Sequence, residues 1–241
     1  MGPVIGITAD VKTNDGDART PHDLRVKGNY AQAIAEAGGL PILVPPDAAA
    51  EEIVELIDGL LIPGGDDIDP VHFGQALHPE ALLQNPLRYR AESALYRAAP
   101  KALPIFGICY GCQFINVMQG GTLIQHLPDL TGAMKHTGGE VQKYELEPES
   151  RVAKAIGSNH AEGKSYHHQA IEQPGRDVRI TGHAEDGTAE AIEVADRDWT
   201  VAVQWHPERT LDDEAMRRLF RAFVEEAAAY RAQRRAHPVG V

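Results

Sequence analysis

The 241-residue sequence has few cysteines, a deficit of basic residues and no long apolar run. Its 2 cysteines, Cys109 and Cys112, are three positions apart, which excludes a disulfide framework. Lysine and arginine number 23 against 35 aspartate and glutamate residues, a formal net charge of -12. That balance argues against a nucleic-acid partner and weakly favours a cationic substrate. No apolar stretch approaches membrane-spanning length, so we expect no membrane association.

We also expect no secretion signal, because the first residues lack a basic segment and a long apolar segment. The sequence therefore predicts a cytoplasmic protein. With 43% hydrophobic and 24% charged residues, the composition is typical of a globular domain. We expect a single domain over residues 1–241, with a flexible tail at about 232–241.

Strand-like and helix-like runs alternate in the first half of the chain. Apolar strands are predicted at 3–8, 40–44, 59–62 and 103–106, and helices at 27–37, 48–57, 91–99 and 112–119. This alternation is typical of an α/β protein with a mostly parallel sheet covered by helices on both faces.

The second half of the chain has a different pattern. Strands at 141–147, 178–182, 188–194 and 200–205 are joined by polar turns and predict a small additional antiparallel region. A final helix is expected at about 212–231. Long irregular segments at 10–25 and 66–88 are of a kind that is often functional.

One thiol has a distinctive setting, Gly107-Ile108-Cys109-Tyr110-Gly111. An apolar run precedes it and a helical run follows it. Glycines two positions before and after allow a sharp strand-to-helix turn that exposes the central side chain. The start of the helix favours the thiolate form, so Cys109 is a candidate nucleophile.

A base for this nucleophile is predicted at the end of the strand Val201 to Trp205, in His206-Pro207-Glu208. Side chains two apart in extended chain point to the same side, so Glu208 is expected to orient the His206 ring. For the oxyanion we expect the backbone N–H groups of Tyr110 and Gly65.

Other residues allow more than one reading. Cys109 and Cys112 form a C-x-x-C pattern, but no second cysteine pair accompanies it, so a redox or zinc role is disfavoured. Adjacent His167 and His168 would point to opposite faces of a strand, which is poor geometry for chelation. Gln113 lies one helical turn beyond Cys109 and is a candidate contact for the substrate. No metal or other cofactor is predicted.

Several motifs together resemble the class I glutamine amidotransferase superfamily, and within it the γ-glutamyl-γ-aminobutyrate hydrolase branch, peptidase family C26. The resemblance extends from about Val4 to Phe223. Its motifs are Gly-Ile-Cys-Tyr-Gly-Cys-Gln at 107–113, Gln-Trp-His-Pro-Glu at 204–208, Pro-Gly-Gly-Asp-Asp-Ile-Asp-Pro at 63–70 and Ser-Tyr-His-His-Gln at 165–169.

The resemblance implies a flavodoxin-like fold and a catalytic triad of Cys109, His206 and Glu208. It also implies substrate contacts from a second set of residues: Gly64, Tyr166, His167 and His168. The expected reaction is hydrolysis of a γ-glutamyl amide, of the γ-aminobutyrate or polyamine type, through a thioester.

Two alternatives stay open. One is a glutaminase subunit that delivers ammonia to a separate synthase, and the other is a binding protein on an inactive scaffold. A homodimer is possible. The family usually has arginine after the nucleophile, so we expect Tyr110 to shift the substrate preference.

Overall fold

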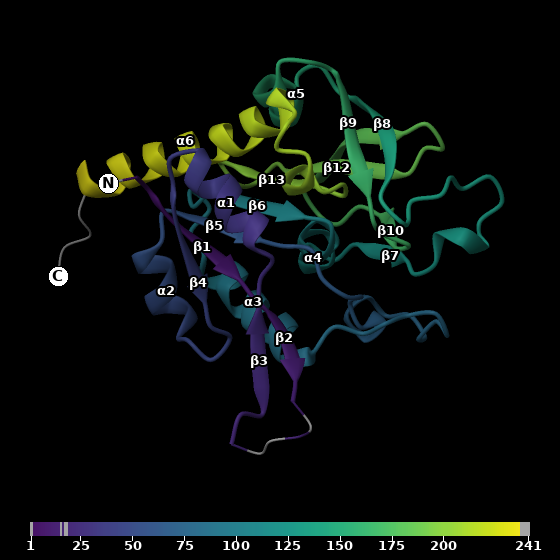
Figure 1. Cartoon of the computed structure of the whole chain (residues 1–241), viewed down its shortest axis with the longest axis horizontal. Helices are drawn as coiled ribbons and strands as arrows, with labels where there is room; N and C mark the ends of the chain where they lie inside the picture. The colour runs from purple at the N-terminus through teal and green to yellow at the C-terminus, as the bar shows by residue number, and fades with distance from the viewer. Residues whose placement is uncertain (1, 15, 17–18, 237–241) are drawn as a thin grey trace.

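The computed structural model describes residues 2–14, 16 and 19–236, and a nine-stranded sheet forms its centre (Figure 1). The strand order is β4-β1-β5-β6-β13-β12-β11-β8-β9. Five neighbouring strands are parallel: β4 (Leu40–Val44), β1 (Val4–Thr8), β5 (Gly59–Ile62), β6 (Ile105–Ile108) and β13 (Thr200–Val203).

The other four strands extend the same sheet in antiparallel fashion: β12 (Ala189–Val194), β11 (Val178–Ala184), β8 (Glu140–Leu146) and β9 (His160–Ser165). Strand β13 lies at the junction, because it pairs in parallel with β6 and antiparallel with β12. Two small two-stranded antiparallel sheets are separate from the main sheet: the hairpin of β2 (Asp10–Thr13) with β3 (His22–Arg25), and β7 (Thr122–Ile124) paired with the distant β10 (Ala170–Gln173).

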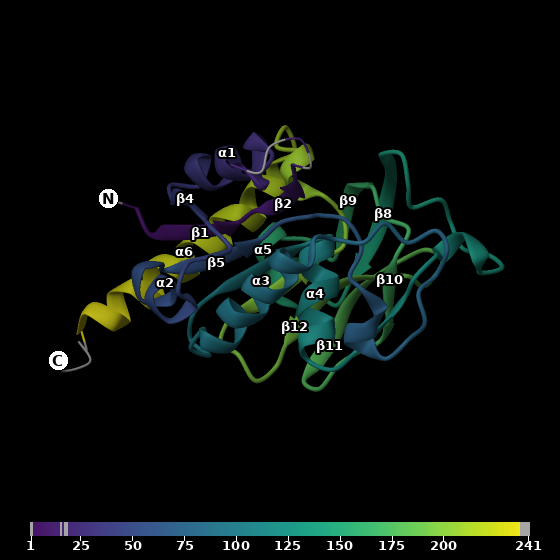
Figure 2. The same cartoon turned by 90° about the horizontal axis from the view of Figure 1, so that it is seen from below.

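Helices cover both faces of the sheet, and each face has its own apolar core (Figure 2). One face packs against α1 (Gly28–Glu36), α5 (Arg151–Ile156) and α6 (Glu214–Ala236). The opposite face packs against α2 (Ala50–Leu56), α3 (Pro86–Ala98) and α4 (Tyr110–Met118). The predicted α/β architecture, with helices on both faces and additional antiparallel strands, is therefore confirmed.

Short 3₁₀ helices occur at Pro70–Phe73, Leu127–Asp129 and Pro207–Arg209. No helix among residues 2–14, 16 and 19–236 combines the length and apolar character needed to cross a membrane.

The structure differs from the predicted elements in several places. Helix α3 begins at Pro86 rather than near residue 91, because the Asn85 side chain caps it and proline suits its first position. The irregular segment 10–25 contains the β2–β3 hairpin. Strand β9 and helix α5 were not predicted from the sequence.

The predicted flexible tail at about 232–241 is wrong for residues 232–236, which continue α6. Arg231 donates to the Gly2 carbonyl oxygen at 2.6 Å, and Arg234 donates to the carboxylate of Asp58 at 3.2 Å. These contacts fasten the helix to the sheet. The remainder of the predicted tail, residues 237–241, lies outside the described residues.

Candidate active site

The candidate active site lies at the carboxyl ends of the parallel strands β5, β6 and β13, where ligands commonly bind in open α/β sheets. These strands deliver Gly64 and Gly65, Cys109, and His206 respectively to one pocket of about 780 Å³. The register explains the meeting, because Ile108 pairs with Val203 and the Cys109 N–H donates to the Val203 carbonyl at 2.8 Å.

Cys109 occupies a strained turn between β6 and α4, with φ 54° and ψ -105°. Glycine is required at both flanking positions, because neighbouring backbone atoms approach them too closely for a side chain. A Cβ on Gly107 would lie 2.7 Å from the Gly111 carbonyl oxygen, and one on Gly111 would lie 2.1 Å from the Ile62 carbonyl oxygen. The predicted sharp turn at Cys109 is therefore confirmed.

His206 and Glu208 form the predicted pair, with Nδ1 of His206 at 2.7 Å from Oε1 of Glu208. The backbone differs from the expected extended form, because residues Pro207–Arg209 make a 3₁₀ turn. With Nδ1 engaged by Glu208, Nε2 is the ring nitrogen left to interact with the Cys109 thiol. All three side chains are buried.

This setting changes the protonation of His206. Burial by itself lowers the pKa of the ring, but the neighbouring Cys109 and Glu208 outweigh burial and raise the pKa to about 9. His206 is therefore positioned to hold a proton beside the thiol at neutral pH.

Two backbone N–H groups border the thiol. Tyr110 is the first residue of α4, where a backbone N–H has no acceptor within the helix. Gly65 lines the pocket, and its N–H has no hydrogen-bond acceptor in the part of the chain described above. The neighbouring Gly64 N–H instead donates to the Tyr30 hydroxyl at 3.1 Å. The placement is compatible with the predicted oxyanion role, which stays a prediction.

The structure places some of the predicted substrate-contact residues in the pocket and others outside it. Gly64 and Tyr166 line the pocket, and the Tyr166 ring lies edge-on to His206 at 5.5 Å between centroids. Gln113 is buried beneath the site and donates to Gln169 O and Gln204 Oε1.

The two adjacent histidines point apart, as predicted. His167 is buried next to Glu190, and His168 contacts the Asp67 carboxylate at 3.0 Å. Neither lines the pocket that contains Cys109.

The expected effect of Tyr110 on substrate preference stays a prediction, but the structure places its side chain away from the pocket. Its side chain is 1% exposed, and its hydroxyl donates to Glu92 Oε2 at 2.8 Å. Glu92 also accepts from Thr8 at 2.6 Å and from Arg88 at 2.9 Å. The Tyr110 side chain therefore belongs to a buried polar network on the far side of the turn.

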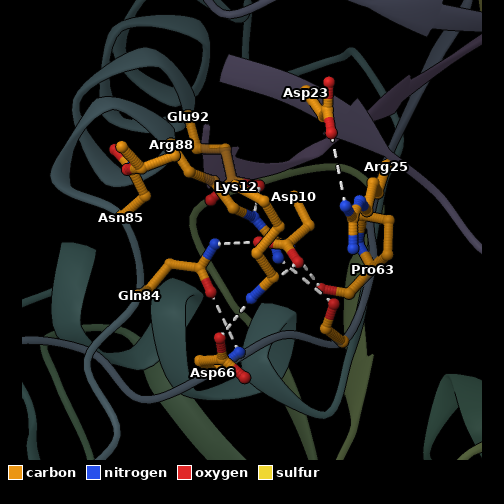
Figure 3. A network of polar contacts seen from close by, with 12 residues as sticks. Asp10, Lys12, Asp23, Arg25, Pro63, Asp66, Gln84, Asn85, Arg88 and Glu92 are labelled. Atoms are coloured by element: carbon orange, nitrogen blue, oxygen red, sulfur yellow. Dashed lines mark hydrogen bonds and ion pairs between the residues drawn. The ribbon is translucent and has the colours of Figure 1, made fainter. Parts of the chain in front are cut away.

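Arg88 connects this network to the glycine loop of the site (Figure 3). Its guanidinium donates to the carbonyl oxygens of Pro63 at 2.8 Å and Gly64 at 3.2 Å. Those bonds hold the loop that presents Gly65 to the pocket. The sequence offered one signal for this role, the i, i+4 spacing of Arg88 and Glu92 on α3.

Basic residues outnumber acidic ones around the pocket, in contrast to the whole chain. The four basic residues of the lining are Lys12, Arg25, Lys27 and Arg209. The two acidic ones, Asp10 and Asp66, both bind Lys12, at 3.1 and 2.5 Å (Figure 3). Arg209 stacks on the Tyr166 ring at 3.8 Å. The pocket is therefore suited to an anionic ligand.

Comparison with known proteins shows the family and the fold of the chain. A family model described as Peptidase C26 matches residues 3–208. A Mycobacterium tuberculosis protein, provisionally named a glutamine amidotransferase, is 38% identical over 95% of this chain and 76% of its own length. The Escherichia coli γ-glutamyl-γ-aminobutyrate hydrolase is 29% identical over 92% of each chain.

A solved structure shows the same fold at lower identity. The glutaminase domain of Trypanosoma brucei CTPS with bound acivicin superimposes with a TM-score of 0.66 at 15% identity, covering 94% of each chain.

Proposed function

The chain belongs to the peptidase C26 family, and from that we propose that it hydrolyses γ-glutamyl amides through a thioester on Cys109. The observation that carries the proposal is the meeting of Cys109 and His206 in one pocket, with the His206 ring hydrogen-bonded to the buried Glu208. A thiol, a base and an orienting carboxylate are the parts that acyl transfer to cysteine requires.

In the proposed reaction the Cys109 Sγ attacks the γ-carbonyl carbon, and negative charge develops on the carbonyl oxygen beside the N–H groups of Gly65 and Tyr110. The C–N bond then breaks, and His206 gives its proton to the leaving amine. Water next attacks the thioester while His206 accepts its proton. The C–S bond breaks, and glutamate and the thiolate are released.

Glu208 has a positioning role in this scheme. Its carboxylate fixes the His206 ring through Nδ1, which directs Nε2 to the reacting atoms. The same carboxylate stabilises the imidazolium that holds the proton before the amine leaves.

The basic pocket supports an amine product that carries a carboxylate. Lys27 provides positive charge at the rim, whereas Arg209 lies 3.5 Å from the Glu208 carboxylate and Lys12 is neutralised by two aspartates. An ω-amino acid such as γ-aminobutyrate matches this charge better than a polyamine does. This local feature outweighs the preference for a cationic amine that the overall charge of -12 favours weakly.

The test measures glutamate and amine release from γ-glutamyl-γ-aminobutyrate, γ-glutamyl-putrescine and glutamine. We expect the highest kcat/KM for the first. Cys109→Ala should abolish turnover, whereas Cys112→Ala, three residues along the same segment, should retain it. Mass spectrometry of the quenched enzyme should find one glutamyl group on Cys109.

Glutamine as the only substrate, stimulated by a separate synthase, would instead establish the glutaminase alternative, which the named relative in M. tuberculosis favours. Full activity of Cys109→Ala would exclude both mechanisms.

A further inference from the structure

A second group of chemically versatile side chains lies in the interior, apart from the pocket. It consists of His136, before β8, His167, after β9, and Glu190 on β12, hereafter the buried cluster. The three residues are 2%, 4% and 0% exposed. Their nearest nitrogen and oxygen atoms all lie within 4.8 Å of one another. Unpaired titratable groups at such depth are costly, so the arrangement needs a physical explanation.

The outer ring nitrogens of both histidines are already engaged. His136 Nε2 lies 3.0 Å from Asp186, whose carboxylate also accepts the backbone N–H groups of Met134 and Thr188. His167 Nδ1 lies 2.9 Å from the Gln169 carbonyl oxygen. A carboxylate and a carbonyl accept, so these two nitrogens carry the ring protons.

The inner nitrogens therefore present lone pairs in the neutral rings. His136 Nδ1 lies 3.3 Å and His167 Nε2 3.4 Å from the same oxygen, Oε1 of Glu190. Among the described residues, neither nitrogen and neither Glu190 carboxylate oxygen has a hydrogen-bond partner. Either a second proton on His136, whose pKa Glu190 and Asp186 raise, or a metal ion between the three side chains would satisfy these groups.

The separations distinguish a metal ion from a shared proton. A charge-assisted N–H···O bond is about 2.7–2.9 Å long, and His206 and Glu208 in this same molecule meet at 2.7 Å. Ligands held about 2.0–2.1 Å from a tetrahedral zinc ion lie about 3.3–3.4 Å from one another. The two contacts to Glu190, at 3.3 and 3.4 Å, have the second spacing, and the two inner histidine nitrogens lie within 4.8 Å of each other.

The surroundings follow the pattern of metal sites as well. Histidine ligands of metals usually donate their second N–H to a carboxylate or a backbone carbonyl. Here the acceptors are the Asp186 carboxylate for His136 and the Gln169 carbonyl oxygen for His167. Two imidazoles and one carboxylate suit zinc and similar transition metals.

We propose that His136, His167 and Glu190 bind a divalent transition-metal ion of the Zn²⁺ class, with water completing the coordination. The rings of His167 and His168 point apart and do not form a chelating pair. The partners of His167 in the buried cluster, His136 and Glu190, come from distant segments of the chain. Because the ligands come from two loops and β12, the ion would fasten both loops to the sheet.

The buried cluster is also connected to the active site through backbone and neighbouring residues. The Glu190 carbonyl oxygen accepts the Gln204 N–H at 2.7 Å, two residues before His206. Tyr166, adjacent to His167, lies against His206 in the pocket. The proposal stands independently of the proposed reaction, since it concerns occupancy and stability.

The test measures metal content in a Cys109→Ala background, so that the active-site thiol contributes no binding. Untagged protein is refolded with zinc chloride, freed of unbound metal and analysed by mass spectrometry. We expect about one zinc per chain. His136→Ala and Glu190→Gln should each lower the content at least tenfold. The matched control is His183→Ala, an exposed histidine on β11 next to β12, which should retain the zinc.

Two measurements on the unmutated cluster keep the test decisive if a variant fails to fold. Refolding with zinc should raise the melting temperature relative to refolding with a chelator. Cobalt(II) in place of zinc should give the strong visible absorption of a tetrahedral site.

Folded protein that holds less than about a tenth of an equivalent, with a melting temperature unaffected by zinc, would overturn the proposal. It would establish instead a protonated His136 held between Asp186 and Glu190. Equal zinc in wild type and Glu190→Gln would overturn it too.

Discussion

His206 carries the proton on which the proposed chemistry depends. Although burial opposes it, Cys109 and Glu208 raise the pKa of this ring to about 9. Below that pH the ring is protonated and can donate its proton to the leaving amine. Above it the proton is lost, so we expect amine release to decline as the pH rises through about 9. Initial rates between pH 6 and 10.5 would measure this.

A γ-glutamyl aryl ester is the control for that profile, because its leaving group needs no proton. Its hydrolysis should continue at pH values where amide hydrolysis has declined. If the hydrolysis rates of both substrates decline in parallel, the loss comes from another group or from unfolding.

Tyr110 illustrates a residue that is next to the nucleophile but points away from the substrate. Tyr110→Phe removes the donor to Glu92 and leaves a buried carboxylate oxygen unsatisfied, which should cost about 1–3 kcal/mol in the free energy of unfolding. Urea denaturation measures the loss. KM should stay within about twofold, because the ring does not line the pocket.

The matched control is Tyr89→Phe, whose hydroxyl lies 4.0 Å from the Met118 sulfur and makes only a weak contact. We expect little loss of stability there. A large change in KM for Tyr110→Phe with unchanged stability would indicate instead that the Tyr110 side chain contacts the substrate.

At the scale of elements, the C-terminal helix is fastened to the sheet by its last turns. Arg234 donates to the carbonyl oxygen of Glu55 at 2.9 Å and to the buried Asp58 at 3.2 Å. We expect Arg234→Ala to lower the free energy of unfolding by about 1–2 kcal/mol. Arg235→Ala, an exposed neighbour on the same helix, should change it by less than about 0.5 kcal/mol. Equal effects of the two would contradict this attachment.

The elements also show what the sequence could predict. The parallel strands were identifiable because each is a short apolar run, and two of them, Leu40–Val44 and Gly59–Ile62, are followed directly by proline. Strand β9 was not, since His160–Ser165 contains no β-branched or aromatic residue and forms its ladder only with β8. Tertiary pairing overrides local propensity there.

Part of the candidate site could likewise be predicted from the sequence, and part could not. Local motifs predicted the proximity of Cys109, His206 and Glu208, because each lies at a strand end or in a short fixed spacing. The direction of the Tyr110 side chain depends on Glu92, 18 residues earlier on α3. His136 is an isolated histidine in a polar loop, with no local signal for its meeting with Glu190.

For the whole molecule, the charge distribution matters more than its total. The chain has a formal net charge of -12, yet its pocket has more basic than acidic residues. Replacing Lys27 with glutamine should raise KM for γ-glutamyl-γ-aminobutyrate about two- to fivefold, the effect of one exposed charge. KM for glutamine, which lacks the distal carboxylate, should change less. Steady-state kinetics on both substrates at low salt would measure the difference.

Lys154→Gln on α5 is the matched control, since it removes one positive charge away from the pocket. A similar rise in KM for both variants would indicate a general charge effect rather than local recognition.

The position of β13 between β6 and β12 determines when the site can exist during synthesis. The nucleophile strand leaves the ribosome well before its neighbour, because the whole antiparallel half is translated in between. Long-range pairing of this kind forms late in folding. The thiol therefore meets its histidine only when almost the entire chain is available. Labelling of Cys109 by a glutamine-analogue electrophile would accordingly report the completion of folding, not its onset.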